Sequence, residues 1–266
     1  MEKIMNIASS NTENKAENRN LVKAMELMAQ HGIITISELT QIFNNKSLAR
    51  EALEKLFSRG WIESYETDQG TMIWHLTDLG CEMLASVSET EPICIMCVDP
   101  KSCDTKRMLL GLKTRLLLEA HPLVTNWKTA GTIKREGGWW INGLDASFEL
   151  AGTKIALSLE LAFCRQRDKE FINKVKPILE SFIDKNVLYI TNTVSLVDSM
   201  RVRKQGEFPL YAYTGSYFIL REDMLHNKLQ TKIYSLTGKH TKLFKWGAEE
   251  ELNPALKPAG TALTAN

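Results

Sequence analysis

The chain has 266 residues, a formal net charge of +1, 44% hydrophobic residues and 24% charged residues. These are the values of a globular protein that can bury a sizeable core, in one large domain or two smaller ones, and they argue against extensive disorder. An apolar run of about 18 residues and a charged-then-apolar leader are both missing, which argues against a membrane span and against secretion and favours the cytoplasm.

The first elements follow a polar tail. Residues 1–18 lack sustained periodicity and are typical of a mobile segment. Apolar residues at helical spacing then predict a helix that ends at Gly32, and a second, short helix that Ser37 caps and that runs through Phe43.

A stronger helix is predicted over 46–58, with Leu48, Ala52, Leu53 and Leu56 on its buried face. Two strands, 61–66 and 71–77, follow around a turn at "TDQG", and a helix in "TDLGCEMLA" closes the unit.

Three helices followed by a two-stranded wing resemble a winged helix-turn-helix, above all in "LFSRGWIESYETDQGTMIWHLTDLG". The resemblance makes 46–58 the recognition helix, with Asn45, Lys46 and Arg50 near its N-terminal end to contact the major groove and its phosphates. Winged helices also act as dimerisation or docking modules. Residues 1–90 carry 8 Lys/Arg against 13 Asp/Glu, so this alternative stays open.

The segment 89–104 joins the two halves and contains Cys94, Cys97 and Cys103. Three thiols could hold zinc if His121 or another group supplied a fourth ligand, or could be redox-active. A structural zinc site normally shows two paired ligand sets, and only one pair is visible, so an ordinary linker is favoured.

The second half opens with a predicted helix over 106–121 that carries Glu119 near its end, and residues 122–140 are interpreted as a connecting segment. The stretch "LDASFELAGTKIALSLELA" (144–162) then alternates between apolar and polar residues and predicts a β-hairpin with a two-residue turn at Ala151-Gly152. This turn pairs residues whose numbers sum to 303, so the apolar residues of both strands share one face, and Glu149 pairs with Lys154.

The same register brings two carboxylates together on the polar face. Asp145 faces Ser158, and Glu160 is its diagonal neighbour. Diagonal neighbours lie roughly 7–8 Å apart, close enough for two carboxylates to share one divalent cation. Spacing alone equally fits two surface acids on the wet face of a hairpin.

The hairpin is followed by a predicted amphipathic helix over 164–186, a buried strand at 187–191, a short helix near 193–204 and strand-like runs in 211–220 and 231–238. The order helix, hairpin, helix, strand is that of the PD-(D/E)XK nuclease core, in which one acid opens a hairpin strand and a second lies in the next strand. The predicted fold class is therefore α+β, with an N-terminal winged helix followed by a restriction-endonuclease-like (PD-(D/E)XK) domain.

Residues 20–205 resemble the replication-relaxation family, which includes the MobC-type relaxases of mobilisable plasmids. The motifs that carry the resemblance are "LLLEAHPLVTNWKT", "GLDASFEL", "KIALSLELA", "KEFINKV" and "NVLYITNTVSLVDSMR". Leu144 stands where the family's "PDA" has proline, Ser158 stands in the first place of Glu-x-Glu, and Ala162 stands where a lysine would follow Glu160. A degenerate domain that only binds DNA is therefore the alternative.

The resemblance implies a plasmid mobilisation relaxase that nicks DNA at a transfer origin with Mg²⁺ or Mn²⁺. Asp145, Glu160 and Glu119 are the expected metal ligands, and Lys169 or Lys174, or else Arg165, is expected to supply the positive charge. The expected partners are double-stranded and locally single-stranded plasmid DNA and a coupling or accessory mobilisation protein.

The remaining expectations concern the basic half and the division of the chain. Residues 91–266 carry 25 Lys/Arg against 19 Asp/Glu, which suits a phosphate backbone. The basic residues expected to contact DNA here are Arg165, Arg167, Arg201 and Arg203. The predicted divisions are a tail (1–18), the winged helix (19–88), a linker (89–104), the nuclease-like domain (105–246) and a C-terminal tail (247–266). The five histidines are scattered singly, which argues against relaxase chemistry that depends on clustered metal-binding histidines.

Overall fold

The computed structural model describes residues 12–67, 70–87, 105–137, 143–163, 185–193, 215–235 and 240–247. The chain divides into two compact units between Leu112 and Lys113. Helices and sheets occur together, and the larger sheet has both parallel and antiparallel strands, so the expected α+β class is confirmed. Within the described ranges, no helix is long and apolar enough to cross a membrane.

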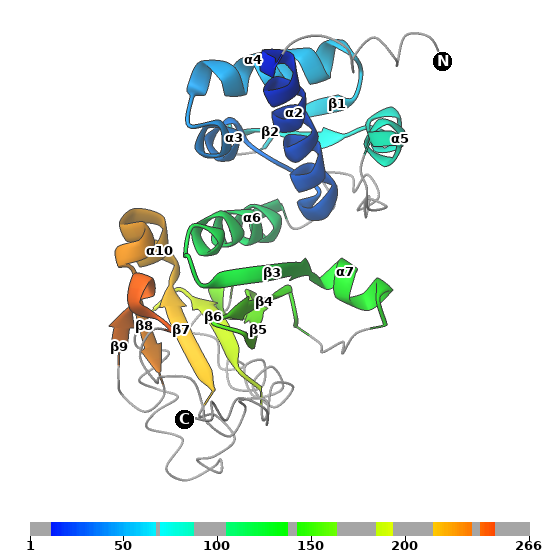
Figure 1. Cartoon of the computed structure of the whole chain (residues 1–266). Helices are drawn as coiled ribbons and strands as arrows, with labels where there is room; N and C mark the ends of the chain where they lie inside the picture. The colour runs from blue at the N-terminus through cyan, green and yellow to red at the C-terminus, as the bar shows by residue number, and fades with distance from the viewer. Residues whose placement is uncertain are drawn as a thin grey trace. The chain divides into compact units, whose positions relative to one another are not determined.

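The first unit contains three helices, a two-stranded antiparallel sheet and a further helix (Figure 1). Its elements are α2 (Thr12–His31), α3 (Ile36–Phe43), α4 (Lys46–Ser58), β1 (Ile62–Glu66), β2 (Met72–Leu76) and α5 (Asp78–Val87). This is the order expected from the sequence. An additional bridge joins Ile34 to Trp74, so the segment before α3 extends the small sheet.

Three details of these helices differ from expectation. Helix α2 begins at Thr12, within the segment 1–18 that was predicted to be a mobile tail. Thr35, not Ser37, caps α3, because the Thr35 hydroxyl accepts a hydrogen bond from the Ser37 backbone N–H while Glu38 accepts one from the Thr35 backbone N–H. The threonine and the glutamate three residues later form a capping box. On α4 the buried residues are Ala49, Ala52, Leu53 and Leu56, and Leu48, at the edge of this stripe in the first turn of the helix, is 47% exposed.

Gly80, in the second position after the "TD" that opens α5, is required by a close approach of two backbones. A Cβ atom at this position would lie 2.0 Å from the backbone oxygen of Trp61, which accepts a hydrogen bond from the Thr77 N–H. Because backbone rather than a flexible side chain is in the way, α5 would have to move.

We therefore expect Gly80→Ala to lower the free energy of unfolding by about 3 kcal/mol, measured by urea denaturation. Gly60→Ala is the matched control: its φ is +70°, but nothing lies within 4 Å of the added Cβ, so we expect a loss of only about 1–2 kcal/mol. Equal stability of Gly80→Ala and wild type would contradict this packing.

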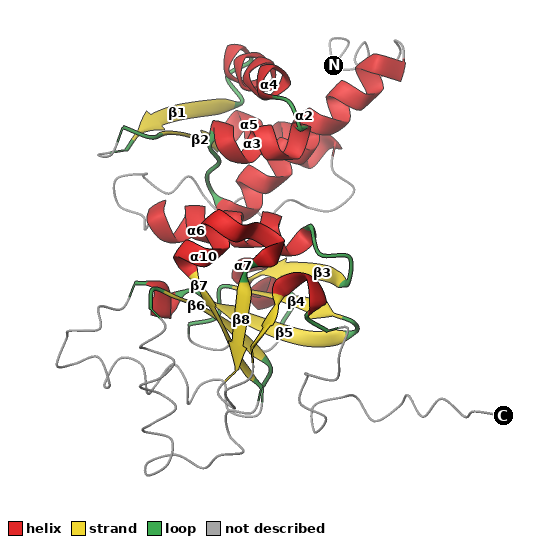
Figure 2. Cartoon of the chain, turned by 90° about the vertical axis from the view of Figure 1, so that its left-hand side faces the viewer, coloured by secondary structure: helices red, strands yellow, loops and turns green. Residues whose placement is uncertain are grey.

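The second unit is built on a seven-stranded sheet with the order β3-β4-β5-β6-β7-β8-β9 (Figure 2). Its strands are β3 (Val124–Thr129), β4 (Ala146–Leu150), β5 (Thr153–Ser158), β6 (Val187–Thr191), β7 (Ser216–Leu220), β8 (Lys232–Ser235) and β9 (His240–Lys242). Strand β6 runs parallel to β5 and β7, and the other neighbours are antiparallel. The helices are α6 (Thr105–Glu119), which spans the division between the units, α7 (Ala130–Arg135), α10 (Arg221–Asn227), and the short 3-10 turns η1 (Glu160–Ala162), η3 (Lys228–Gln230) and η4 (Leu243–Lys245).

The hairpin register is the one that the alternation predicted. Strands β4 and β5 pair from Ala146↔Leu157 to Leu150↔Thr153, with Glu149 opposite Lys154. The turn residues Ala151 and Gly152 have φ values of 49° and 78°, as a tight two-residue turn requires.

One face of the sheet, here called the helix face, carries the even-numbered residues of β4 and the odd-numbered residues of β5. On it the Phe148 ring stacks on Trp127, with ring centroids 5.8 Å apart, and meets Trp246 edge-on at 6.2 Å. Helices α6 and α10 lie on the same side of the sheet (Figures 1 and 2), and the Thr114 hydroxyl donates to the sulfur of Met224.

The other face, here called the Asp145 face, is not the wet surface that the alternation suggested. Ser147, Ala156 and Ser158 lie on it and are at most 2% exposed. The physical reason is that β5 is an interior strand paired in parallel with β6, and parallel strands are normally covered on both faces.

The segment 122–140, interpreted as a connection, contains β3 and α7. Strand β3 is an edge strand with an irregular register between Thr125 and Lys128, and Asn126 there has a φ of 53°. This bulge breaks the alternation from which a strand is recognised, which explains why the sequence pattern missed it.

Candidate functional site

Asp145 is fixed where three strands meet. Its backbone N–H donates to the Leu157 carbonyl and its backbone oxygen accepts from Ala130, both at 2.9 Å. Its Oδ2 atom accepts a hydrogen bond from the Leu159 N–H at 2.8 Å. Asp145 therefore contacts the residues on both sides of Ser158, and the half-buried carboxylate is held at the end of β5.

Glu160 lies at the same end of the hairpin but not on the strand. Strand β5 ends at Ser158, and Glu160 is the first residue of the 3-10 turn η1. The expectation that it is a diagonal strand neighbour of Asp145 is therefore wrong. The backbone turns at Leu159, whose φ and ψ are −99° and −5°, and the Asn192 amide donates to the Ala162 carbonyl. Glu160 nevertheless directly follows Leu159, the residue that Asp145 binds.

Two buried hydroxyl groups lie near these acids. Ser158 pairs with Tyr189 of β6, and Thr191 follows two residues later, so the Ser158 and Thr191 side chains are on the Asp145 face. Both residues are fully buried, and neither hydroxyl has a hydrogen-bond partner among the described residues. Such groups are rare in folded proteins and each costs about 1–3 kcal/mol, which makes this end of the sheet suited to a polar ligand.

Glu119 does not join this pair. It forms an ion pair with Arg115 of α6, with 2.8 Å between Oε1 and Nε, and the Arg115 guanidinium lies over the Trp127 ring on the helix face. Within the described part of the chain, no three His, Cys, Asp or Glu side chains are grouped so that they could hold a metal ion. The described acids of the site are thus Asp145 and Glu160.

The residues expected to contact DNA in the first unit lie at the start of α4. Asn45 is the N-cap of this helix, and its Oδ1 atom accepts from the N–H groups of Ser47 and Leu48 at 2.8 and 3.2 Å. Its side-chain oxygen is therefore already used to cap the N-terminus of α4. Lys46 and Arg50 are exposed.

Several predicted residues lie outside the described ranges. They are Lys169, Lys174, Arg165, Arg167, Arg201, Arg203 and the cysteines Cys94, Cys97 and Cys103.

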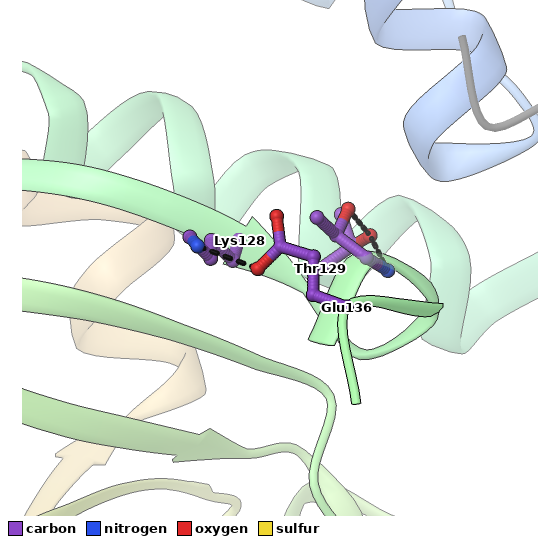
Figure 3. Close-up of polar contacts among 4 residues, drawn as sticks. Lys128, Thr129 and Glu136 are labelled. Carbon is purple, nitrogen blue, oxygen red and sulfur yellow. Dashed lines mark hydrogen bonds and ion pairs between the residues drawn. The ribbon is translucent and has the colours of Figure 1, made fainter. Parts of the chain in front are cut away.

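Two lysines that were not expected to be site residues lie on the Asp145 face. Lys128 is opposite Ser147, and Lys154 is opposite Glu149. Lys128 Nζ is 2.6 Å from Glu136 Oε2, and Figure 3 shows the two side chains pointing toward each other, beside the end of α7 that Thr129 caps. Only the recognition of "VTNWKT" as a strand would have placed Lys128 on this face of the sheet.

Charge and desolvation both act on Lys154. Partial burial lowers its pKa below the ordinary lysine value, and the positive charge of Lys128 lowers it further, whereas Glu149 and Glu136 oppose the shift. Lys128 and Lys154 thus lie among Glu136 and Glu149, and this edge of the sheet carries charges of both signs.

His121, considered above as a zinc ligand, is a core residue. It is 1% exposed, and its Nδ1 atom accepts a hydrogen bond from the Leu123 N–H at 3.2 Å. Burial lowers the pKa of His121, and the nearby backbone of Phe244 and Leu243 only partly offsets this. The ring is therefore neutral. Because Nδ1 accepts a hydrogen bond, the proton is on Nε2, a buried atom without a hydrogen-bond partner among the described residues.

This burial predicts a pH-dependent stability. Below a pH of roughly 6.5, His121 is protonated in the unfolded state but stays neutral in the folded state. The free energy of unfolding therefore falls by up to about 1.4 kcal/mol per pH unit as the pH is lowered, until the pKa of the folded state is reached. Urea denaturation between about pH 5 and 8 measures the slope. His121→Gln should reduce it, whereas His226→Gln, at a side chain 75% exposed, should not. An unchanged slope in His121→Gln would contradict the assignment.

Comparison of the chain with protein-family models, curated proteins and solved structures gave no match.

Proposed function

We propose that this chain is a DNA-processing protein of the replication-relaxation type, a mobilisation relaxase that nicks DNA at a transfer origin. In this proposal the first unit is a winged helix-turn-helix, and the second is a nuclease-like domain of the PD-(D/E)XK kind. The order of helices and strands in each unit supports it, because α6, the β4–β5 hairpin and the parallel strand β6 occur in the expected sequence.

The observation that carries the proposal is the hydrogen bond from the Leu159 N–H to Asp145 Oδ2. It ties the acid that opens β4 to the residue directly before Glu160. Two carboxylates, one directly before β4 and one in the turn after β5, thereby belong to the same end of the hairpin, which is where the nuclease core has its two acids.

The residues at this end fit a hard divalent cation. Mg²⁺ is usually held by one or two carboxylates, with water and substrate phosphate completing its shell, and it prefers oxygen ligands. Asp145 and Glu160 would hold Mg²⁺ or Mn²⁺, and the buried Ser158 hydroxyl adds a third oxygen nearby. A bound ion would polarise the phosphate and make water a better nucleophile.

Positive charge beside the scissile phosphate is the second requirement, because negative charge develops there. The family lysine is replaced by Ala162. Lys128 is on the Asp145 face, one diagonal position from Asp145 in the β3–β4 register, and is the described residue best suited to this role. Lys169 and Lys174 remain candidates from the sequence.

A second function is favoured by one specific observation. Glu160 has left the strand, and Ser158 stands in the first acidic place of the motif. A domain with this altered site would bind DNA without cutting it, as a regulator of plasmid replication or transfer.

Conversion of supercoiled DNA to open circles distinguishes the two functions. The substrate should carry the sequence that flanks the protein's own coding region, and the reactions should contain Mg²⁺, Mn²⁺ or EDTA. Open circles that form only with metal support the relaxase. DNA binding without any nicking supports the regulator, and neither activity would contradict both.

The winged-helix part of the proposal makes its own prediction. Lys46→Ala combined with Arg50→Ala should weaken duplex binding and lower the slope of log K against log salt by about 1.8, because two phosphate contacts are lost. Fluorescence anisotropy at several salt concentrations measures this slope. Arg19→Ala with Lys23→Ala, at two exposed positions of α2, is the matched control. Equal losses in both double variants would show that α4 is not the contact helix.

A further inference from the structure

The edge of the sheet formed by β8 and β9 is strongly basic. Residues 224–247 contain five lysines and no aspartate or glutamate. Four of these lysines are described and exposed: Lys228, Lys232, Lys242 and Lys245. The carboxylate of Asp223, just before this stretch, accepts a hydrogen bond of 2.7 Å from the backbone N–H of Lys232.

The strand register concentrates this charge on one face. Lys232 is directly opposite Lys242, and two residues along Tyr234 is opposite His240, so all four side chains are on the same face. The Tyr234 and His240 rings lie 6.2 Å apart. Like charges directly opposite each other destabilise a sheet, and this cost is removed when an anion lies between them.

Phe244 lies two residues after the end of β9, and its ring is exposed to solvent beside these lysines. Its side chain is 40% exposed, and Lys242 Nζ and Lys245 Nζ lie 6.0 and 5.9 Å from the ring centroid. Its position is fixed because Leu243 in η4 and Trp246, which directly follows this turn, are fully buried. The Leu243 N–H also donates to the Thr231 carbonyl at 2.8 Å. The ring is therefore presented by an anchored turn and loses little freedom when it binds.

Lysines alone have a simpler explanation, since charged residues on an edge strand prevent pairing with another sheet. That explanation does not account for an exposed aromatic ring between two of them. Rings that stack on bases and cations that bind the backbone are the two components of single-stranded nucleic acid recognition. Duplex DNA fits this surface less well, because its bases are already stacked on one another. An acidic protein fits less well because it has no bases on which the ring could stack.

We infer that Lys232, Tyr234, His240, Lys242, Phe244 and Lys245, here called the β9 patch, bind single-stranded nucleic acid. The inference rests on the proposed function only in taking DNA as the partner. It adds a second contact surface at β8 and β9, whose paired side chains the register through β6 and β7 places on the Asp145 face, with β8 three strands from β5. A strand opened around a nick is the segment that such a patch would hold.

Fluorescence anisotropy with a short labelled oligothymidylate tests this on the full chain. Phe244→Leu should bind about tenfold more weakly, because the stacking ring is lost, and Phe244→Trp should bind as wild type does. Lys242→Ala with Lys245→Ala should lower the salt slope by about 1.4. Lys23→Ala with Lys106→Ala, two exposed lysines of α2 and α6, removes the same charge elsewhere and should leave the slope unchanged.

The outcomes separate this inference from the nuclease proposal. Oligothymidylate binding that depends on the patch, in a protein that does not nick, supports the patch and contradicts only the nuclease. Wild-type affinity in both Phe244→Leu and the Lys242/Lys245 variant overturns the inference, as does an equal loss in the Lys23/Lys106 variant. Binding to vesicles of anionic phospholipid without binding to the oligonucleotide also overturns it.

Discussion

Asp145→Asn should reduce the rate of metal-dependent nicking by about a hundredfold or more, because it removes a negative charge from the proposed metal ligand. The amide is nearly isosteric and still offers an oxygen to the Leu159 N–H, so the hairpin end and the stability should change little. Duplex affinity should also be retained. The measurement is the initial rate of open-circle formation, with anisotropy and thermal denaturation on the same preparation.

Two further variants make this result specific. Asp145→Ala loses the charge and the hydrogen bond together, so it should be about 1 kcal/mol less stable than Asp145→Asn. Glu149→Gln removes a carboxylate from the same strand and face, where Glu149 accepts from the Asn126 amide at 2.8 Å, and should nick as wild type does. A wild-type rate in Asp145→Asn, or an equal loss in Glu149→Gln, would show that Asp145 is not part of the site.

Trp246→Ala should lower the free energy of unfolding of the second unit by about 3–5 kcal/mol. The indole is fully buried and meets Phe148 and Tyr217 edge-on, at 6.2 and 5.2 Å between centroids, so truncation leaves a large cavity beside β4 and β7. Urea denaturation measures the loss.

Phe244→Ala is the matched control for this loss, because Phe244 lies in the same turn but is 40% exposed. It should change stability by less than about 0.5 kcal/mol. If the two variants were equally stable, Trp246 would not anchor the turn that displays Phe244.

The hairpin shows how far sequence periodicity reaches. Its register follows from the alternation and the two-residue turn, because any slip by one residue would turn the buried side chains to the opposite face. The strand over Val187–Thr191 was also predicted, from a continuous apolar run. In both segments the local pattern and the tertiary packing require the same structure.

The predicted strands were wrong where the alternation of apolar and polar residues was interrupted, and where it continued beyond the end of the strand. The bulge at Asn126 concealed β3, and with it Lys128 on the Asp145 face. The alternation continued through Leu161, although the strand ends at Ser158, because Leu159 and Leu161 are buried equally well by a 3-10 turn. Periodicity records which residues are buried and does not record where the backbone turns.

The candidate site was accordingly predictable only in part. The position of Asp145 at the start of a strand followed from the register. The turn at Glu160 and the buried hydroxyl of Thr191 depend on the pairing of β5 with β6, two strands that are distant in the sequence. The capping role of the Asn45 oxygen likewise depends on where the backbone of α4 begins to turn, which the apolar spacing does not determine to one residue.

Titration with Mn²⁺, followed by the electron paramagnetic resonance signal of the free ion, tests most directly whether Asp145 and Glu160 hold a divalent metal. We expect wild type and Glu149→Gln to bind the ion equally, and the double variant Asp145→Asn with Glu160→Gln to bind none at this site. Equal Mn²⁺ binding by wild type and the double variant would contradict the assignment, and so would no binding by wild type.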